Sequence, residues 1–286
     1  MEGIKKILVT GADSQLGKTL RELQPAGFEI DFYDKQSLDI TNANNIDKIL
    51  KRKNYDYCFN FAAYTNVEQA EIDTKKCFEI NAEAVKKLAE LTAQHHTALV
   101  HISTDYVFDG QKKTPYTETD IPHPLNQYGK SKLEGEKWAA LNPIHYIIRT
   151  SWLYSSFNRN FVKTVLQLAQ NKDTLQLVND QTGSPTYAPD LIDFILHLVR
   201  FVEQPKSGIY HFSNSGETTW FEFGKEILSL RRKQIALTPV TSVVFQTKAA
   251  RPAYSVLSYQ KIKKVLNYTP RNWREGLKEF LIKNKI

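Results

Sequence analysis

The fold is decided near the start of the chain, by the stretch Ile4-Lys5-Lys6-Ile7-Leu8-Val9-Thr10-Gly11-Ala12-Asp13-Ser14-Gln15-Leu16-Gly17. An apolar, β-branched run ends at Gly11, and helical spacing begins at about Gln15. Small residues at such a turn let the backbone approach a pyrophosphate, and the helix that follows offers free N–H groups at its N-terminus. Ser14 replaces the middle glycine of the usual three, which weakens the match. Taken alone, the turn still favours a dinucleotide site, and a plain tight turn is the alternative.

Strand-like and helical segments alternate through the first half of the chain. The predicted strands are Ile4–Thr10, Phe28–Tyr33, Asp56–Ala63, Ala98–Ser103 and His145–Thr150. The predicted helices are Gln15–Leu23, Asn44–Lys53, Lys75–Gln94 and Ser131–Leu141. This alternation indicates βαβ units and therefore an α/β fold, a Rossmann-type doubly wound parallel sheet that collects ligands at the carboxyl ends of its strands.

The regular alternation of strands and helices ends at about Ser151. The predicted helices are Phe161–Gln170, Leu191–Val202, Phe221–Leu230, Tyr259–Leu266 and Trp273–Ile282, and the predicted strands are Leu175–Val178 and Gly208–Ser213. We predict a dinucleotide-binding Rossmann domain over residues 1–152 and a smaller, mainly substrate-binding C-terminal domain over 153–286. Part of 184–212 is expected to return to the Rossmann sheet.

Composition excludes several classes of protein. The 286 residues are 41% hydrophobic and 24% charged, which is ordinary for a folded globular protein and unlike disordered or collagen-like chains. No stretch approaches the roughly 20 apolar residues of a membrane helix, and the first ten residues do not form a signal peptide. Two cysteines, Cys58 and Cys77, suit a reducing cytoplasm. The net charge of +7 is scattered and lacks a nucleic-acid-reading motif, so a small anionic ligand is the expected partner.

A carboxylate and a lysine stand side by side where the second predicted strand ends. Asp34 follows the glycine turn by about two dozen residues, the distance at which an acid can hold the hydroxyls of an adenosine ribose. Lys35 can instead meet a 2′-phosphate, which would favour NADPH over NADH. The sequence leaves both cofactors open.

Hydroxyl groups end the fourth predicted strand, and a tyrosine–lysine pair follows some two dozen residues later. Tyr128 and Lys132 are four residues apart, so a helix would place them on one face, one turn apart. A phenol with a pKa near 10 is a poor acid–base catalyst at neutral pH unless a neighbouring ammonium favours its ionised form. We predict that Lys132 lowers the pKa of Tyr128 and that Thr104 orients a substrate oxygen toward the phenol. The alternative is an exposed tyrosine and a solvated lysine at the start of an amphipathic helix.

The order of these motifs resembles the extended short-chain dehydrogenase/reductase superfamily and, within it, the family of dTDP-4-dehydrorhamnose reductases. The resembling segments run through nearly the whole chain: Gly11–Gly17, Leu38–Thr41, Asn60–Thr65, Val67–Glu71, Asn81, Ser103–Gly110, Pro124–Lys132, Arg149–Tyr154, Asn160-Phe161, Asp180–Thr186, Ala250–Pro252 and Tyr254-Ser255. Each motif is weak alone, whereas the ordered set is specific.

The resemblance implies hydride transfer from NADPH or NADH to the C4 ketone of a dTDP-4-dehydro-6-deoxy sugar, dTDP-4-dehydro-β-L-rhamnose. It implies that Tyr128 donates a proton, that Lys132 tunes it and holds the nicotinamide ribose, and that Thr104 holds the carbonyl. The other cofactor-binding residues would be Gly11, Ser14, Gln15, Leu16, Gly17, Asp34, Lys35, Asp39, Ile40, Ala62, Ala63 and Tyr64. The substrate-binding residues would be Thr104, Asp105, Tyr106, Trp152, Asn160 and Arg251.

Other interpretations remain open. Asp105 can be a structural strand-end residue, Trp152 can belong to the core, and Arg251 can lie at a loop corner. Some proteins that resemble this family are non-catalytic NADP-binding regulatory subunits, and others reduce a different nucleotide-sugar ketone. The family has been associated with Mg²⁺ and with dimers, yet the quoted motifs assign no metal ligand, so metal and homodimer stay unassigned.

Overall fold

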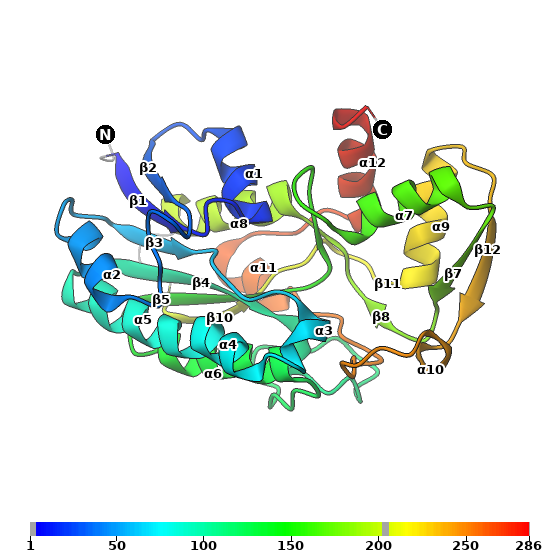
Figure 1. Cartoon of the computed structure of the whole chain (residues 1–286). Helices are drawn as coiled ribbons and strands as arrows, with labels where there is room; N and C mark the ends of the chain where they lie inside the picture. The colour runs from blue at the N-terminus through cyan, green and yellow to red at the C-terminus, as the bar shows by residue number, and fades with distance from the viewer. Residues whose placement is uncertain (1–3, 202–205, 286) are drawn as a thin grey trace.

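The computed structural model describes residues 4–201 and 206–285 (Figure 1). Its central sheet has six parallel strands in the order β10-β5-β4-β3-β1-β2. The strands are β1 (Lys5–Thr10), β2 (Phe28–Tyr33), β3 (Tyr57–Asn60), β4 (Ala98–Thr104), β5 (His145–Thr150) and β10 (Gly208–His211). The chain reverses direction across the sheet between β1 and β3, and ligands of such sheets bind at this switch point.

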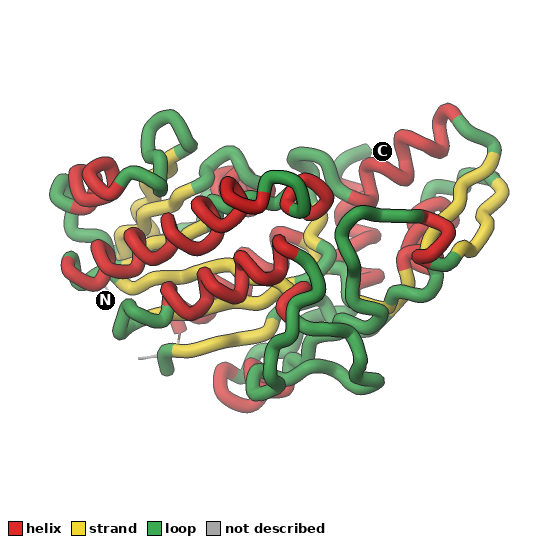
Figure 2. The backbone as a smooth tube through the Cα atoms, turned by 60° about the horizontal axis from the view of Figure 1, so that its bottom comes forward, coloured by secondary structure: helices red, strands yellow, loops and turns green. Residues whose placement is uncertain are grey.

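Helices cover both faces of the sheet, as the alternation of side chains requires. Ile7 and Val9 point to one face, which packs against α1 (Gln15–Leu23), α8 (Ala188–Phe201) and α11 (Gln260–Leu266). Leu8 points to the other face, which packs against α2 (Ala43–Leu50), α5 (Ala84–Gln94) and α6 (Gln127–Ala139). Figure 2 brings this second face forward, with its long helices lying across the strands. The predicted doubly wound α/β fold is confirmed.

A second group of elements lies beyond the carboxyl ends of the strands (Figure 1). Its apolar core joins three helices and two strands: α7 (Phe161–Asn171), α9 (Trp220–Leu230), α12 (Trp273–Lys283), β7 (Thr174–Val178) and β12 (Ala236–Val240). Two short strand pairs and a helical turn complete this group: β6 (Leu153–Tyr154) with β9 (Thr186–Tyr187), β8 (Thr182–Gly183) with β11 (Thr218–Thr219), and α10 (Ser242–Phe245). The sequence did not predict strand β12, because none of its side chains is fully buried and Pro239 interrupts its pattern.

Strand β10 and helix α8 come from the second half of the chain, yet both belong to the central sheet layer. β10 pairs with β5 over Gly208–His211, and α8 packs its apolar side chains on the sheet. The predicted helix Leu191–Val202 thus corresponds to α8, although Val202 lies outside the described residues. The division into units 1–152 and 153–286 stays a prediction.

The predicted helix Lys75–Gln94 is wrong in one respect, because it is three elements: α4 (Thr74–Phe78), the π-helical turn η1 (Glu79–Glu83) and α5. The π turn carries Asn81, whose side chain accepts from the Tyr64 N–H at 2.8 Å and donates to the Tyr64 carbonyl at 3.0 Å. It thereby fastens the loop between β3 and the short helix α3 (Val67–Ala70). Periodicity cannot detect a single π turn, because the helical spacing resumes after it.

Two further boundaries differ from prediction and matter for the site. The predicted strand Asp56–Ala63 ends as β3 at Asn60, so Phe61–Ala63 are free to form a loop. Helix α6 begins at Gln127 rather than Ser131, because the Asn126 side chain caps it by accepting from the Gly129 N–H at 2.7 Å. Tyr128 is therefore helical. Within 4–201 and 206–285, no helix is both long and apolar enough to cross a membrane.

Candidate active site

A cavity of about 550 Å³ opens where β1, β3, β4 and β5 end. It runs from the glycine turn to α6, across the switch point at which this fold binds ligands. Fourteen residues predicted for the site line it: Gly11, Ser14, Gln15, Leu16, Lys35, Asp39, Ile40, Ala62, Ala63, Thr104, Asp105, Tyr128, Lys132 and Trp152. The sequence motifs thus meet in one place, although the role of each residue stays a prediction.

The glycine turn brings Gly11 close to the backbone of the loop that follows β3. Gly11 has φ +63°, and a Cβ atom there would lie 2.5 Å from the backbone nitrogen of Ala62. Ser14 has φ −68°, which any residue adopts, and its Oγ accepts from the Gly17 N–H at 3.1 Å. Position 14 therefore does not need the glycine that the usual motif has there, and serine caps α1 instead.

The two predicted readers of the adenosine ribose lie differently. Lys35 is exposed and lines the cavity, whereas Asp34 does not. The Asp34 Oδ1 accepts from the Ser37 hydroxyl at 2.7 Å and from the Ser37 N–H at 2.8 Å, and this hydroxyl is the main cause of its lowered pKa. Asp34 is thus already engaged in a turn. Lys76 from α4 also lines this end of the cavity, and helical periodicity gave no signal for it.

Tyr128, Lys132 and Thr104 converge at the other end. Tyr128 and Lys132 lie one turn apart on α6, and Thr104 is the last residue of β4. The Thr104 hydroxyl donates to Asp105 Oδ1 at 3.1 Å and accepts from the Tyr106 N–H at 3.2 Å. The Tyr106 ring lies edge-on to the Tyr128 ring, with centroids 6.2 Å apart. These contacts fix the phenol beside the strand-end hydroxyl.

Burial controls the electrostatics of this cluster. Loss of solvent raises the pKa of Tyr128 above its usual value, and the hydrogen-bonded Thr104 hydroxyl opposes that shift. Burial lowers the pKa of Lys132 to about 8 and raises the pKa of Asp105 to about 7. The net direction for Tyr128 is opposite to the predicted lowering by Lys132, because the phenol is taken out of water while the Lys132 Nζ is bonded to His101, 3.3 Å away.

Trp152 contributes an aromatic side chain to the cavity wall. It lines the cavity, and its ring stacks on Trp220 with centroids 3.5 Å apart and planes 9° from parallel. Its backbone is left-handed, with φ +46°, which is strained for a residue of this size. Trp220 thus supports the indole, which also packs against the apolar core of the second group of elements.

Six predicted residues do not line the cavity: Gly17, Asp34, Tyr64, Tyr106, Asn160 and Arg251. Asn160 caps α7 by accepting from the Lys163 N–H at 3.1 Å. The Arg251 Nη2 donates to Glu68 Oε1 at 2.5 Å, which ties the C-terminal half to α3. Asn158 and Arg159, which stand just before Asn160, do line the cavity and were missed. The predicted roles of the six residues stay predictions.

A buried ion pair attaches α6 to the sheet. The Arg149 guanidinium donates to both carboxylate oxygens of Glu136, at 2.9 and 2.7 Å, and the Ser103 hydroxyl donates to the same carboxylate at 2.5 Å. Arg149 and Glu136 are only 2% and 4% exposed. Removing either partner would leave a buried charge unpaired, so this fork fixes the helix that carries Tyr128 and Lys132.

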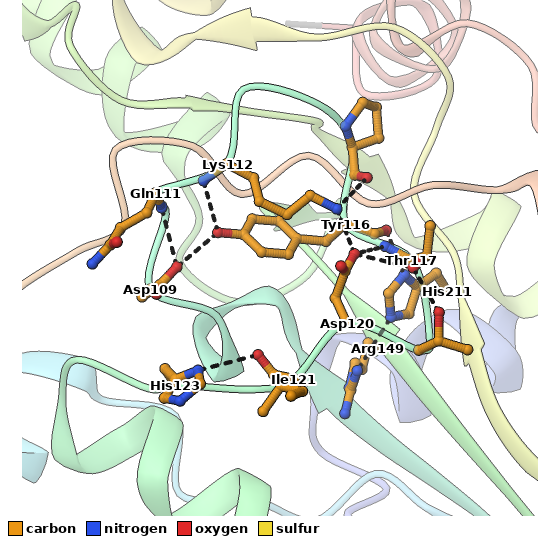
Figure 3. Close-up of polar contacts among 12 residues, drawn as sticks. Asp109, Gln111, Lys112, Tyr116, Thr117, Asp120, Ile121, His123, Arg149 and His211 are labelled. Carbon is orange, nitrogen blue, oxygen red and sulfur yellow. Dashed lines mark hydrogen bonds and ion pairs between the residues drawn. The ribbon is translucent and has the colours of Figure 1, made fainter.

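The loop that follows the strand-end residues is anchored to strands β5 and β10 (Figure 3). The Tyr116 hydroxyl donates to Asp109 at 2.9 Å, and the Tyr116 carbonyl lies 3.0 Å from His211 Nδ1. His211 Nε2 in turn lies 3.4 Å from the Arg149 guanidinium. The wall at Thr104 and Asp105 therefore continues into a fixed segment.

The described residues give no support to a metal site. Neither range, 4–201 or 206–285, holds a group of three or more His, Cys, Asp or Glu side chains that could bind an ion.

Comparison with known proteins identifies the family. Residues 5–286 match the family described as RmlD substrate binding domain. A dTDP-4-dehydrorhamnose reductase of Aggregatibacter actinomycetemcomitans is 39% identical over 96% of this chain and 97% of its own length. The spore coat polysaccharide biosynthesis protein SpsK of Bacillus subtilis is 41% identical over 96% of both chains. This chain is 37% identical in sequence to a dTDP-4-dehydrorhamnose reductase from Bacillus anthracis. The crystal structure of that protein in complex with NADP matches this structure with a TM-score of 0.92 over 98% of this chain and 99% of that chain. With a cavity built at the switch point of the sheet and relatives that match from end to end, the chain belongs to the RmlD substrate binding domain family.

Proposed function

We propose that this chain uses NADPH to reduce the C4 ketone of dTDP-4-dehydro-β-L-rhamnose to dTDP-β-L-rhamnose. The observation that carries the proposal is the convergence of Tyr128, Lys132 and Thr104 on one cavity that begins at the glycine turn. The names of full-length relatives support the reaction, and the related structure with NADP supports the cofactor. A cytoplasmic location and a homodimer stay predictions from the sequence.

The residues at the glycine turn fit a dinucleotide. The close approach of Gly11 to Ala62 leaves a cradle that a Cβ atom would fill. Helix α1 has no acidic residue in its first turn, so its positive end is not neutralised from within the helix. We infer that Ser14, Gln15 and Leu16 hold the pyrophosphate and that Lys35 meets the 2′-phosphate. Tyr128 and Lys132 would hold the nicotinamide ribose.

Each catalytic side chain has a stated task. When bound, the dihydronicotinamide supplies a hydride to the ketone carbon. The Thr104 hydroxyl orients the carbonyl oxygen, and Tyr128 donates its phenolic proton to that oxygen as negative charge develops. Lys132 stabilises the phenolate that remains. Because burial raises the pKa of Tyr128, the phenol stays protonated until the carbonyl needs the proton.

Oxidation of NADPH by the purified protein tests the proposal. The substrate is dTDP-4-dehydro-6-deoxyglucose together with the 3,5-epimerase that converts it, and the epimerase is left out of a parallel reaction. We expect oxidation only with the epimerase, and dTDP-rhamnose as the product. Oxidation without the epimerase would mean that the chain reduces a different sugar ketone. Binding of NADPH with no oxidation in either reaction would favour a non-catalytic regulatory subunit.

Replacement of the phenol assigns the acid. Tyr128→Phe is expected to lower kcat by about 100-fold or more while the Kd for NADPH changes little, because the hydroxyl acts mainly on the ketone. Tyr116→Phe is the matched control, since this tyrosine lies in the loop of Figure 3 and does not line the cavity. Unchanged turnover in Tyr128→Phe would exclude Tyr128 as the proton donor.

A further inference from the structure

A row of buried polar side chains crosses the sheet beneath Lys132. Thr10, Asn60 and His101 are direct neighbours on the adjacent strands β1, β3 and β4. None of the three is more than 1% exposed. Apolar side chains pack on both faces of the sheet, and the three polar side chains pair with one another, although Asn60 also lines the cavity.

The row ends on the ammonium group of the proposed site. The Thr10 hydroxyl donates to Asn60 Oδ1 at 2.7 Å, and the Asn60 amide nitrogen lies 3.0 Å from His101 Nδ1. His101 Nε2 lies 3.3 Å from Lys132 Nζ. Within the described part of the chain, His101 is the one hydrogen-bonding partner of that Nζ. Lys132 is itself only 2% exposed, although it lines the cavity.

Proton counting restricts what this row can do. A neutral imidazole has one N–H donor and one acceptor nitrogen, and a lysine ammonium only donates. A charged Lys132 therefore needs an unprotonated Nε2, which puts the His101 proton on Nδ1 and requires the Asn60 amide to turn its oxygen toward it. A neutral Lys132 allows the opposite arrangement. The charge of Lys132 and the tautomer of His101 are consequently linked.

We propose that His101 is a positioning residue that holds the charged form of Lys132 by accepting a hydrogen bond through Nε2. His101 touches neither of the proposed ligands directly, and it does not line the cavity. It acts through Lys132. The proposal requires the Asn60 amide to be turned by 180° from the orientation given above, so that its oxygen faces His101 Nδ1 and its nitrogen faces the Thr10 hydroxyl. The inference rests on the proposed function only for its kinetic part, because the hydrogen-bond chain itself is a property of the free protein.

The other groups around Lys132 do not substitute for His101. Glu136, one turn further along α6, is engaged by Arg149 and Ser103. The Cys77 thiol of α4 is 3.1 Å from Ser131 Oγ, and burial raises its pKa, so it stays uncharged at neutral pH. Burial also keeps His101 neutral by lowering its pKa well below the usual value. The charge of Glu136 still opposes the lowering of the Lys132 pKa by burial, but the hydrogen-bond acceptor of the ammonium is the neutral His101.

Two variants separate positioning from packing. His101→Leu removes the acceptor, so the buried ammonium loses its hydrogen bond, and the alkaline limb of the kcat–pH profile is expected to move at least one pH unit lower. His101→Gln can place a carbonyl oxygen near the former Nε2, and its limb is expected to stay near that of the wild type. A residue that only packs would lower kcat or the melting temperature in both variants without moving the limb, and that result would overturn the proposal.

Nitrogen NMR of the imidazole provides a readout that needs no turnover. We expect wild-type His101 to carry its proton on Nδ1 at neutral pH and on Nε2 in Lys132→Met, where no ammonium is present. The same tautomer in both proteins would also overturn the proposal. If the protein oxidises no NADPH, the proposed function fails while the tautomer result still decides the role of His101. In that case the Kd for NADPH would be measured as a function of pH in both His101 variants, in place of the kcat–pH profile.

Discussion

Asp105 is a carboxyl group with almost no access to water. It is 2% exposed, its Oδ2 has no hydrogen-bond partner in the described part of the chain, and burial raises its pKa to about 7. The folded chain therefore binds a proton more tightly here than the unfolded chain does. The contribution of Asp105 to the free energy of unfolding therefore falls as the pH rises from about 4 to about 7.

Asp105→Asn is expected to remove this pH dependence. Relative to the wild type, the variant should gain about 3 kcal/mol of unfolding free energy between about pH 5 and about pH 8, because amide and protonated acid are both neutral. Urea unfolding at the two pH values measures the change. Asp109→Asn is the matched control, since hydrogen bonding lowers the pKa of Asp109, chiefly from the Gln111 N–H, and its titration lies below this range. If the difference in unfolding free energy between Asp105→Asn and the wild type were the same at both pH values, the raised pKa of Asp105 would be contradicted.

Lys35 is expected to distinguish the two cofactors. Its exposed ammonium lines the cavity, whereas the neighbouring Asp34 carboxylate is engaged by Ser37. Lys35→Ala should therefore weaken NADPH binding by about tenfold and leave NADH nearly unchanged, as loss of one charge-assisted contact would do. Lys48→Ala is the control, because that side chain is exposed on α2 and does not line the cavity. Equal losses with both cofactors would show that Lys35 does not read the 2′-phosphate.

At the residue scale, the sequence indicated which side chains could be catalytic better than it indicated which side chains they contact. Tyr128, Lys132 and Thr104 could be selected because their spacing on a helix and at a strand end has a chemical use. Nothing in the sequence indicated that His101 contacts Lys132. That contact depends on the register of β4 against β3 and on the position of α6 over the sheet. Asp34 shows the reverse, since its position suggested a ligand while Ser37 occupies its carboxylate.

At the scale of elements, the wall at Trp152 depends on strand β8. A Cβ atom on Gly183 would lie 2.5 Å from Cε2 of the Trp152 indole, so we expect Gly183→Ala to displace the ring from its stack on Trp220. We expect KM for the nucleotide sugar to rise by about tenfold with little change in the Kd for NADPH. Loss of the near-ultraviolet circular dichroism of the stacked indoles should accompany it.

Trp138→Phe provides the control for that spectrum, because Trp138 lies on α6 and is not part of the stack. A changed spectrum in Gly183→Ala with an unchanged KM would mean that Trp152 does not contact the sugar. An unchanged spectrum would mean that the strand shifts to make room for the methyl group, and the stack would then not depend on Gly183.

Element boundaries were predictable where caps or strong periodicity mark them. The bounds of α1 and β2 agree with prediction to the residue, because Gly11–Ser14 and the turn at Asp34 interrupt the patterns sharply. The π turn at Glu79–Glu83 and the two-residue strands β8 and β11 left no such mark. Their positions depend on tertiary contacts, such as the hold of Asn81 on Tyr64, which local sequence does not encode.

At the scale of the whole molecule, the second half of the chain completes the first. Side chains of α8 and α11, among them Leu191, Phe194 and Leu266, pack in one apolar cluster with Ile7 and Val9 of β1. Strand β10 also pairs with β5 at the edge of the sheet. A sheet face left without these helices would expose a large apolar surface, so the two halves depend on each other for burial.

This dependence leads us to expect a single cooperative unfolding transition. Of the four tryptophans, Trp138 lies on α6 and the other three lie beyond residue 151, so fluorescence of Trp138→Phe reports the second half alone. Its midpoint in urea should coincide with the midpoint from far-ultraviolet circular dichroism of the whole chain. NADPH at about 100 times its Kd should raise both by the same amount, equivalent to about 3 kcal/mol. Separate midpoints, or a shift in only one signal, would instead mean that the second half unfolds as an independent unit in spite of β10 and α8.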